Sequence, residues 1–255
     1  MTNQPDPTCR PVQRAETYGG TLWRKTPQTM TGATSSIDEG RFTEELRLAA
    51  GAQWDRVVHH KFTKELAAGT IDRNVLKKYL IQDYRFLDAF VVLLASIIAN
   101  ARQLEDRIPG CQFLAVITGK ENTYFERSFE KLGCSAEECT SIPDAACTTG
   151  FCNLMLEVAK SGVLADMLSV IVVCEWSYAT WGKIVEKETV RDDFVTYEWV
   201  DLHSGEFFEG VVSYLRGLLD KEGKLISETE RESCKKRFLQ AIQLEEDFFE
   251  YAYSK

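Results

Sequence analysis

The sequence lacks the patterns that mark several common classes of protein. Its eight cysteines form no C-x-x-C pair, so neither a zinc knuckle nor a thioredoxin-like site is indicated. Its three histidines, His59, His60 and His203, do not complete a Glu-x-x-His pattern, so the paired motif of di-iron helical bundles is missing. A lone histidine beside Lys61 is more typical of a surface than of a haem site. We therefore expect no metal and no cofactor.

Long apolar runs and positive charge are also scarce. The longest run, residues 89–99, is about half of the roughly 20 residues that a membrane-spanning helix needs. The net charge of −9 at pH 7 argues against nucleic acid or an anionic membrane as a partner. With 44% hydrophobic and 27% charged residues, the composition is otherwise that of an ordinary globular protein.

Residues 1–40 differ in composition from the rest of the chain. They are rich in Thr, Pro, Gly and Arg without apolar periodicity, which predicts a disordered leader. An organellar transit peptide is the alternative, although Asp6, Glu16, Asp38 and Glu39 make the segment more acidic than such peptides usually are. The absence of a secretory apolar region favours reduced thiols and a cytoplasmic location.

From residue 41 onward, apolar residues recur with the period of a helix, and no stretch alternates as a strand does. Asp72 is a candidate helix N-cap, and Gly69 and Gly133 stand where helices would end. We expect helices at about 40–50, 52–68, 72–101, 111–132, 148–161, 163–187, 194–220 and 227–252. Residues 41–255 are thus predicted to form a single all-α, bundle-like domain.

Two acidic residues interrupt apolar stripes on these helices. Asp83 lies within the stripe that runs from Leu76 to Phe90, and Glu245 lies on the face that carries Phe238 and Phe249. Burial of an unpaired carboxylate is costly, and it raises the carboxyl pKa toward neutrality, as a general acid requires. Structural pairing with an arginine, a tyrosine hydroxyl or a helix end is the commoner role of such an aspartate.

The expected helix at 163–187 places Cys174 and Tyr178 one turn apart and facing the same way. A free cysteine in an apolar stripe is most often a small core residue. A nucleophile would additionally need a lowered thiol pKa or a nearby base. His203 is one candidate for that base.

Taken together, several segments resemble the TenA or thiaminase II family, whose fold is the haem-oxygenase-like helical bundle without haem. The resemblance covers roughly residues 41–254 and depends on the order and spacing of its parts. These are LAAG at 66–69, YLIQDYRFL at 79–87, CEWSY at 174–178, the segment around Trp199, and LEEDFFEYAY at 244–253.

The resemblance implies a hydrolase of thiamin salvage. Such an enzyme converts thiamin, or its aminomethyl- or formylaminomethyl-pyrimidine degradation products, to the hydroxymethyl pyrimidine. The implied catalytic residues are the nucleophile Cys174, the acid and base Glu245, and Asp83, which hydrogen-bonds the ring. The implied substrate-binding residues are Asp83, Phe86, Phe151, Tyr178 and His203. Phe86, Phe151 and His203 fall where the cysteine-containing branch commonly has tyrosines, and a second branch relies on carboxylates without the cysteine.

The resemblance also implies a homodimer or homotetramer that binds a small aminopyrimidine. Two other functions stay open at this point. The same fold could act on a different substrate, or the chain could bind a pyrimidine without turnover, as a regulatory protein would. A pocket that binds ligand while the Cys174 thiol stays unreactive at neutral pH would indicate the second.

Overall fold

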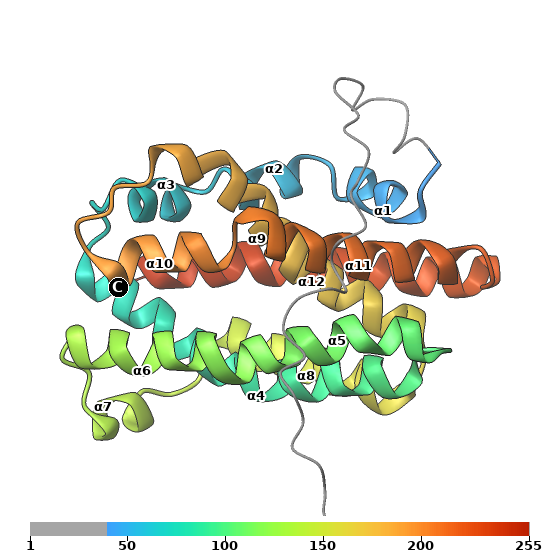
Figure 1. Ribbon diagram of the computed structural model, residues 1–255, viewed down its shortest axis with the longest axis horizontal. Coiled ribbons are helices and arrows are strands. Elements are labelled where there is room, and N and C mark those ends of the chain that lie inside the picture. Colours follow the sequence, from blue (N-terminus) through green and yellow to red (C-terminus); the bar gives the residue numbers. More distant parts are fainter. Residues whose placement is uncertain (1–39, 255) are drawn as a thin grey trace, which may run out of the picture. The chain divides into compact units, whose positions relative to one another are not determined.

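A computed structural model describes residues 40–254 of the chain, and every regular element in that range is helical (Figure 1). The elements are α1 (Phe42–Ala50), α2 (Ala52–Val58), α3 (Lys61–Ala67), α4 (Arg73–Asn100), α5 (Leu104–Val116), η1 (Ile117–Glu121), α6 (Asn122–Lys131), α7 (Ala136–Ser141), α8 (Ala146–Ser161), α9 (Leu164–Val185), η2 (Glu186–Glu188), α10 (Phe194–Leu202), α11 (Gly205–Gly223) and α12 (Glu228–Tyr253). The predicted all-α fold is confirmed. The predicted leader at 1–40 lies outside the described residues, except for Gly40.

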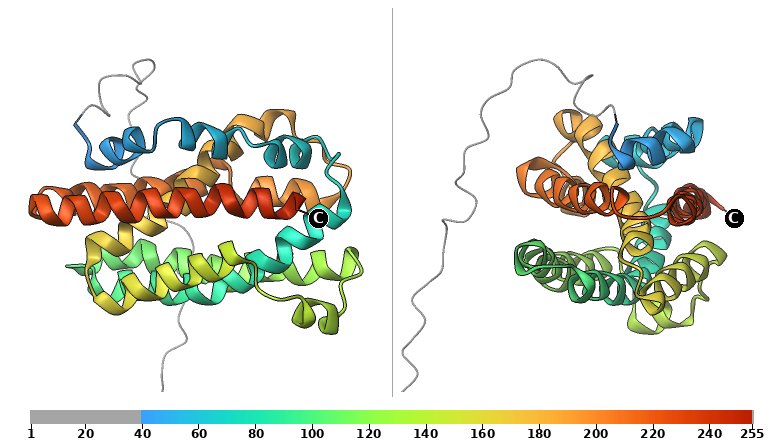
Figure 2. Two further views of the ribbon diagram at one scale, coloured as in Figure 1. Left: turned by 180° about the vertical axis from the view of Figure 1, so that it is seen from behind. Right: turned by 90° about the vertical axis from the view of Figure 1, so that its right-hand side faces the viewer.

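The helices of residues 40–254 lie in two layers with α9 between them. Figure 2 shows α4, α5, α6 and α8 in one layer and α10, α11 and α12 with α1–α3 in the other, while α9 contacts both. Most of the 22 residues of α9 are buried, because this helix is surrounded by neighbours. Residues on α9 are therefore the ones that side chains from both layers can reach.

The longest helices begin where the sequence predicts. The Asp72 side chain accepts hydrogen bonds from the backbone N–H groups of Asn74 (2.7 Å) and Val75, which makes it the N-cap of α4. Ser227 and Glu230 form a reciprocal capping box at the start of α12. These caps fix the two helices that carry Asp83 and Glu245.

Two helices predicted as continuous are broken at histidines. The stretch 52–68 divides at His60, whose Nδ1 accepts the N–H of Phe62 and so caps α3, while its ring stacks on Phe249. The interpretation of this residue as a surface histidine is wrong, since His60 is 8% exposed. The stretch 194–220 divides at His203, where α10 ends and the chain turns into α11.

The helix predicted to begin at residue 111 begins at Leu104 and runs through Pro109. It continues without a loop into η1, a π-helical turn, and then into α6. A further short helix, α7, lies in the segment between the helices predicted at 111–132 and 148–161. The Gln82 side chain holds the end of this connection, because it donates to the Pro143 carbonyl and accepts from the N–H of Ala145.

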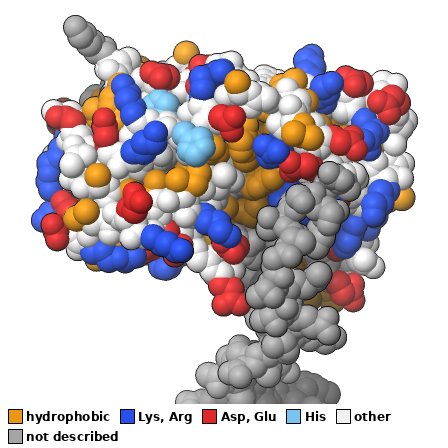
Figure 3. All heavy atoms as spheres, turned by 90° about the horizontal axis from the view of Figure 1, so that it is seen from above, with side chains coloured by type: hydrophobic (Ala, Val, Ile, Leu, Met, Phe, Trp, Pro, Cys, Tyr) orange, Lys and Arg blue, Asp and Glu red, His pale blue; other side chains and the backbone are white. Residues whose placement is uncertain are grey.

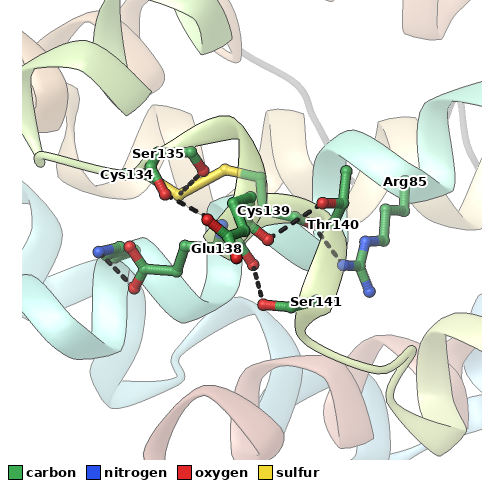
Figure 4. The surroundings of a disulfide bond; sticks show 9 residues. Arg85, Cys134, Ser135, Glu138, Cys139, Thr140 and Ser141 are labelled. Carbon is green, nitrogen blue, oxygen red and sulfur yellow. Dashed lines mark hydrogen bonds and ion pairs between the residues drawn. A yellow bond between two sulfur atoms is a disulfide. The ribbon is translucent and has the colours of Figure 1, made fainter.

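Cys134 and Cys139 form a disulfide across the start of α7, so the expectation of reduced thiols is wrong for this pair. Figure 4 shows the bond beside Arg85, which donates to the Cys139 carbonyl oxygen. Cys111, Cys147, Cys152, Cys174 and Cys234 are free.

Among the described residues, no helix is both long and apolar enough to cross a membrane. On the face drawn in Figure 3, acidic and basic side chains are interspersed.

Candidate active site

One cavity brings together every site residue that the sequence predicts. Asp83 and Phe86 come from α4, Phe151 from α8, Cys174 and Tyr178 from α9, His203 from the α10–α11 junction, and Glu245 from α12. The cavity has an empty volume of about 480 Å³, which includes its opening to solvent. This volume is within the range of small-molecule sites. Seven residues that are far apart in the sequence therefore share one small space, although their roles are not tested by this placement.

Both predicted carboxyl groups are buried against apolar walls. Asp83 is 8% exposed and Glu245 is 3% exposed. Burial raises the pKa of Asp83 to about 8. Burial likewise raises the pKa of Glu245 to about 8, and a hydrogen bond with the Cys174 thiol partly opposes this rise. At neutral pH most of each carboxyl population is therefore protonated, so both groups have a proton to give.

The Cys174 thiol is close to Glu245 but is not a preformed thiolate. Its Sγ also donates to the Val170 carbonyl oxygen at 3.6 Å, one turn back on α9. Burial and the negative charges of Glu245 and Glu175 raise the pKa of Cys174 well above its usual value. The thiol can therefore act as a nucleophile only if a base removes its proton during the reaction.

Aromatic rings form much of the remaining wall. The rings of Phe86 and Phe151 meet edge to face, with centroids 5.2 Å apart. The hydroxyl oxygens of Tyr178 and Tyr79 lie 2.5 Å apart, which fixes the Tyr178 ring from behind. This arrangement offers both stacking and edge contacts to a flat aromatic ligand.

His203 is held as a neutral imidazole. Its Nδ1 lies 2.8 Å from the Trp199 carbonyl oxygen, and because a carbonyl can only accept, Nδ1 carries the proton. Burial lowers the pKa of His203 to about 4. The Cys174 thiol has Val170 and Glu245 as its hydrogen-bond partners, so within residues 40–254 the candidate base His203 is not paired with it. Nε2 is left as an acceptor.

A model of the TENA/THI-4/PQQC family matches residues 49–255. The chain belongs to this family. The aminopyrimidine aminohydrolase of Halalkalibacterium halodurans is 27% identical over 214 residues, which cover 84% of this chain and 96% of the relative. The aminopyrimidine aminohydrolase of Bacillus subtilis is 23% identical over 216 residues, covering 84% and 91%.

Solved structures of TenA proteins share the fold. A TenA homologue from Pyrococcus furiosus superposes with a TM-score of 0.74 at 24% identity, over 83% of this chain and 100% of that one. A protein from a Silicibacter species, described as a TenA family transcription regulator, gives 0.75 at 23% identity, over 85% and 98%. At these identities the likeness establishes the fold and not the activity.

In this TENA/THI-4/PQQC chain, sequence reasoning missed two further carboxyl groups of the cavity. Glu121 ends the π-helical turn η1, and Glu175 follows Cys174 on α9; both line the cavity. Glu175 could have been identified as the one charged residue in the otherwise uncharged stretch between Asp166 and Lys183 of α9, nearly all of which is buried. No such signal exists for Glu121. The π-helix itself is not visible in the apolar periodicity.

The cavity carries four carboxyl groups and no lysine or arginine among its lining residues. Within the described range, no three His, Cys, Asp or Glu side chains are arranged to hold a metal ion. The arrangement is suited to an electron-poor or cationic organic ligand with several N–H donors.

Proposed function

We propose that the protein is an enzyme of thiaminase II type, a thiamin-salvage hydrolase that converts aminopyrimidines to the hydroxymethyl pyrimidine. Family membership and the names of the curated relatives support the reaction class. The observation that carries the proposal is the meeting of Asp83, Cys174 and Glu245, from α4, α9 and α12, in one aromatic cavity. The substrate is thiamin or its aminomethyl- or formylaminomethyl-pyrimidine degradation products.

Asp83 binds the aminopyrimidine edge. As a protonated acid, its O–H donates to a ring nitrogen and its carbonyl oxygen accepts from the exocyclic amine. Its raised pKa, about 8, supplies that proton at neutral pH. Phe86, Phe151 and Tyr178 contact the ring, and Nε2 of neutral His203 offers a further acceptor.

Glu245 moves the proton that covalent catalysis requires. The carboxylate form accepts the Cys174 proton as Sγ bonds to a ring carbon, while Asp83 protonates the ring nitrogen. The bond between the leaving nitrogen and the methylene carbon then breaks, with the electron pair going to nitrogen. The neutral formylamino group needs the proton held by Glu245 as it departs, whereas a thiazolium or an ammonium leaves as a neutral molecule without it. Water adds to the methylene carbon, and its proton goes to Glu245 or, where Glu245 still holds its own, to solvent. The Sγ–carbon bond then breaks with the electron pair going to sulfur, which takes the proton from Glu245, while the ring nitrogen returns its proton to Asp83 and the hydroxymethyl product is released.

The test is turnover of thiamin, aminomethyl pyrimidine and formylaminomethyl pyrimidine, with the hydroxymethyl product quantified by chromatography and mass spectrometry. We expect release of this product from at least one substrate, and its loss in Glu245→Gln. Absence of the product with all three substrates would contradict the proposed reaction.

A second candidate is a protein that binds the pyrimidine without turnover. The raised pKa of the Cys174 thiol favours it, because a protonated thiol is a poor nucleophile at neutral pH. Calorimetric binding of all three compounds without product formation would identify this function. The family resemblance further predicts a homodimer or homotetramer, which light scattering of the purified chain would test.

A further inference from the structure

Glu121 and Glu175 are the two carboxyl groups of the cavity that the proposed reaction does not use. They are 7% and 8% exposed, so both are more than nine-tenths buried. Within residues 40–254, neither side chain has a hydrogen bond or a salt bridge to another side chain, although both line the cavity. Burial of a carboxyl group without a partner costs free energy, so their placement calls for a ligand that provides the partner.

A π-helical turn of the backbone directs Glu121 into the cavity. Glu121 is the last residue of η1, where one wide π-helical turn interrupts the otherwise continuous helix from α5 to α6. Such turns cost hydrogen-bond quality and recur at functional sites. Ile117, four residues earlier in the same turn, lines the cavity with Glu121, so the turn directs both side chains inward.

Glu175 faces a different part of the cavity from its neighbour Cys174. Consecutive residues of an α-helix are about 100° apart, so the thiol and the Glu175 carboxyl diverge around α9. The Glu175 charge nevertheless raises the pKa of Glu121, which shows that the two carboxyl groups act on the same region. Burial is the largest cause of the raised pKa at both positions.

The opposite charge is missing from the cavity wall. Its fourteen lining residues include no lysine or arginine, and His203 is neutral at physiological pH. Burial keeps both carboxyl groups neutral when they have no partner, so a ligand that ionises them has to bring the positive charge itself. In an aminopyrimidine substrate, the positive charge outside the pyrimidine ring lies on the leaving group. This group is an ammonium in aminomethyl pyrimidine and the quaternary nitrogen of the thiazolium ring in thiamin.

We propose that Glu121 and Glu175 form a second subsite that binds a positively charged leaving group, and that this subsite selects cationic aminopyrimidines over neutral ones. This inference rests on the proposed function, since it assigns the leaving-group end of the same cavity. The charge on the leaving nitrogen disappears when its bond breaks. The subsite therefore strengthens binding of the substrate more than it accelerates the chemical step.

The first experiment compares two ligands that differ in this charge. Aminomethyl pyrimidine is cationic at neutral pH, whereas formylaminomethyl pyrimidine is neutral. Glu121→Gln and Glu175→Gln keep the side-chain shape and remove the charge. We expect KM for the cationic substrate to rise roughly tenfold or more, as for loss of a charge-assisted contact, with kcat little changed. KM for the neutral substrate is expected to stay within about twofold.

Glu222→Gln is the matched control. Glu222 is also buried, but it pairs with Arg102 outside the cavity. We expect this variant to leave both KM values unchanged. Circular dichroism melts of all variants establish that the folded proteins are being compared.

The second experiment does not need turnover or a folded Glu121 variant. In a Cys174→Ala background, which is expected not to consume the ligand, calorimetry in buffers of different ionisation enthalpy counts the protons released on binding. A cation lowers the raised carboxyl pKa values, so aminomethyl pyrimidine is expected to release more protons than the formyl compound. Equal proton release, or equal KM changes for the two substrates, would overturn the subsite. Failure of both compounds to bind or react would overturn the proposed function as well.

Discussion

At the residue scale, the decisive side chain is Cys174. We expect Cys174→Ala to reduce product formation to background, because no other described cysteine lines the cavity. Cys147→Ala is the control, since Cys147 is also buried but lies outside the cavity wall. Both variants should fold, and the control should retain wild-type turnover. Full activity of Cys174→Ala would show that the carboxyl groups catalyse the reaction without the thiol.

A substitution at Asp83 can distinguish its role in hydrogen bonding from its role as a proton donor. An asparagine at this position can still donate to a ring nitrogen and accept from the exocyclic amine, but it cannot protonate the ring. We therefore expect Asp83→Asn to keep KM within about threefold and to lower kcat by roughly 10²–10⁴-fold, the usual contribution of a general acid. In the wild type, kcat/KM should fall as pH rises past about 8, the pKa of the Asp83 carboxyl. Steady-state kinetics over pH 6–9.5 measure both effects, and an unaltered kcat would show that Asp83 only binds.

The same scale shows why sequence reasoning found some site residues and missed others. Asp83 and Glu245 interrupt stripes on helices that have a polar side, so each stands out against its apolar neighbours. Glu175 is on a helix whose apolar residues extend over nearly all sides, so it lies beside the stripe that carries Cys174 and does not interrupt it. Glu121 is turned inward by a π-helical turn, which shifts the face that a period of 3.6 residues would assign.

At the scale of the elements, the break after His203 combines a local signal with tertiary packing. Ser204 and Gly205 follow directly, and Gly205 has a φ of 80°, so the sequence carried a turn signal that the prediction of one helix at 194–220 overlooked. The packing against α9 is what the sequence does not show. A Cβ atom added to Gly182 on α9 would lie 2.2 Å from the His203 carbonyl oxygen. Only a glycine permits this contact, and the contact places His203 at the cavity.

We expect Gly182→Ala to destabilise the protein severely, by on the order of 3 kcal/mol or more, because a backbone carbonyl cannot move aside cheaply. Gly217 on α11 provides the control: a Cβ there would meet no atom within 4 Å. Gly217→Ala should stabilise the helix by about 0.5–1 kcal/mol. Chemical denaturation of the two variants measures this contrast, and similar midpoints would refute the close contact between α9 and the α10–α11 junction.

At the scale of the whole molecule, the cavity makes the protein less stable as pH rises. Asp83 and Glu245 have a pKa of about 8 when folded, and their ordinary values lie near 4. Between these pH values the folded state binds more protons than the unfolded state, so the free energy of unfolding falls with increasing pH. His203 acts in the opposite sense, but only between about pH 4 and its ordinary pKa of 6.5. Between pH 6.5 and about 8 the carboxyl groups dominate the slope, and at higher pH the raised pKa values of the buried thiols of Cys174 and Cys234 act in the same sense.

We therefore expect the Tm of the ligand-free protein to decrease between pH 6.5 and 8.5. Asp83→Asn should make that decrease shallower and should raise the stability at pH 8.5 by on the order of 1 kcal/mol or more, about 2–4 °C in Tm for each kcal/mol. Asp72→Asn is the matched control, because Asp72 is exposed and asparagine caps a helix equally well. Scanning fluorimetry across this range decides the point. A Tm that is constant or rises, with parallel curves for Asp83→Asn and the wild type, would mean that the cavity carboxyl groups are ionised at little cost. The cavity carboxyl groups would then be deprotonated at neutral pH and could not act as general acids toward the substrate.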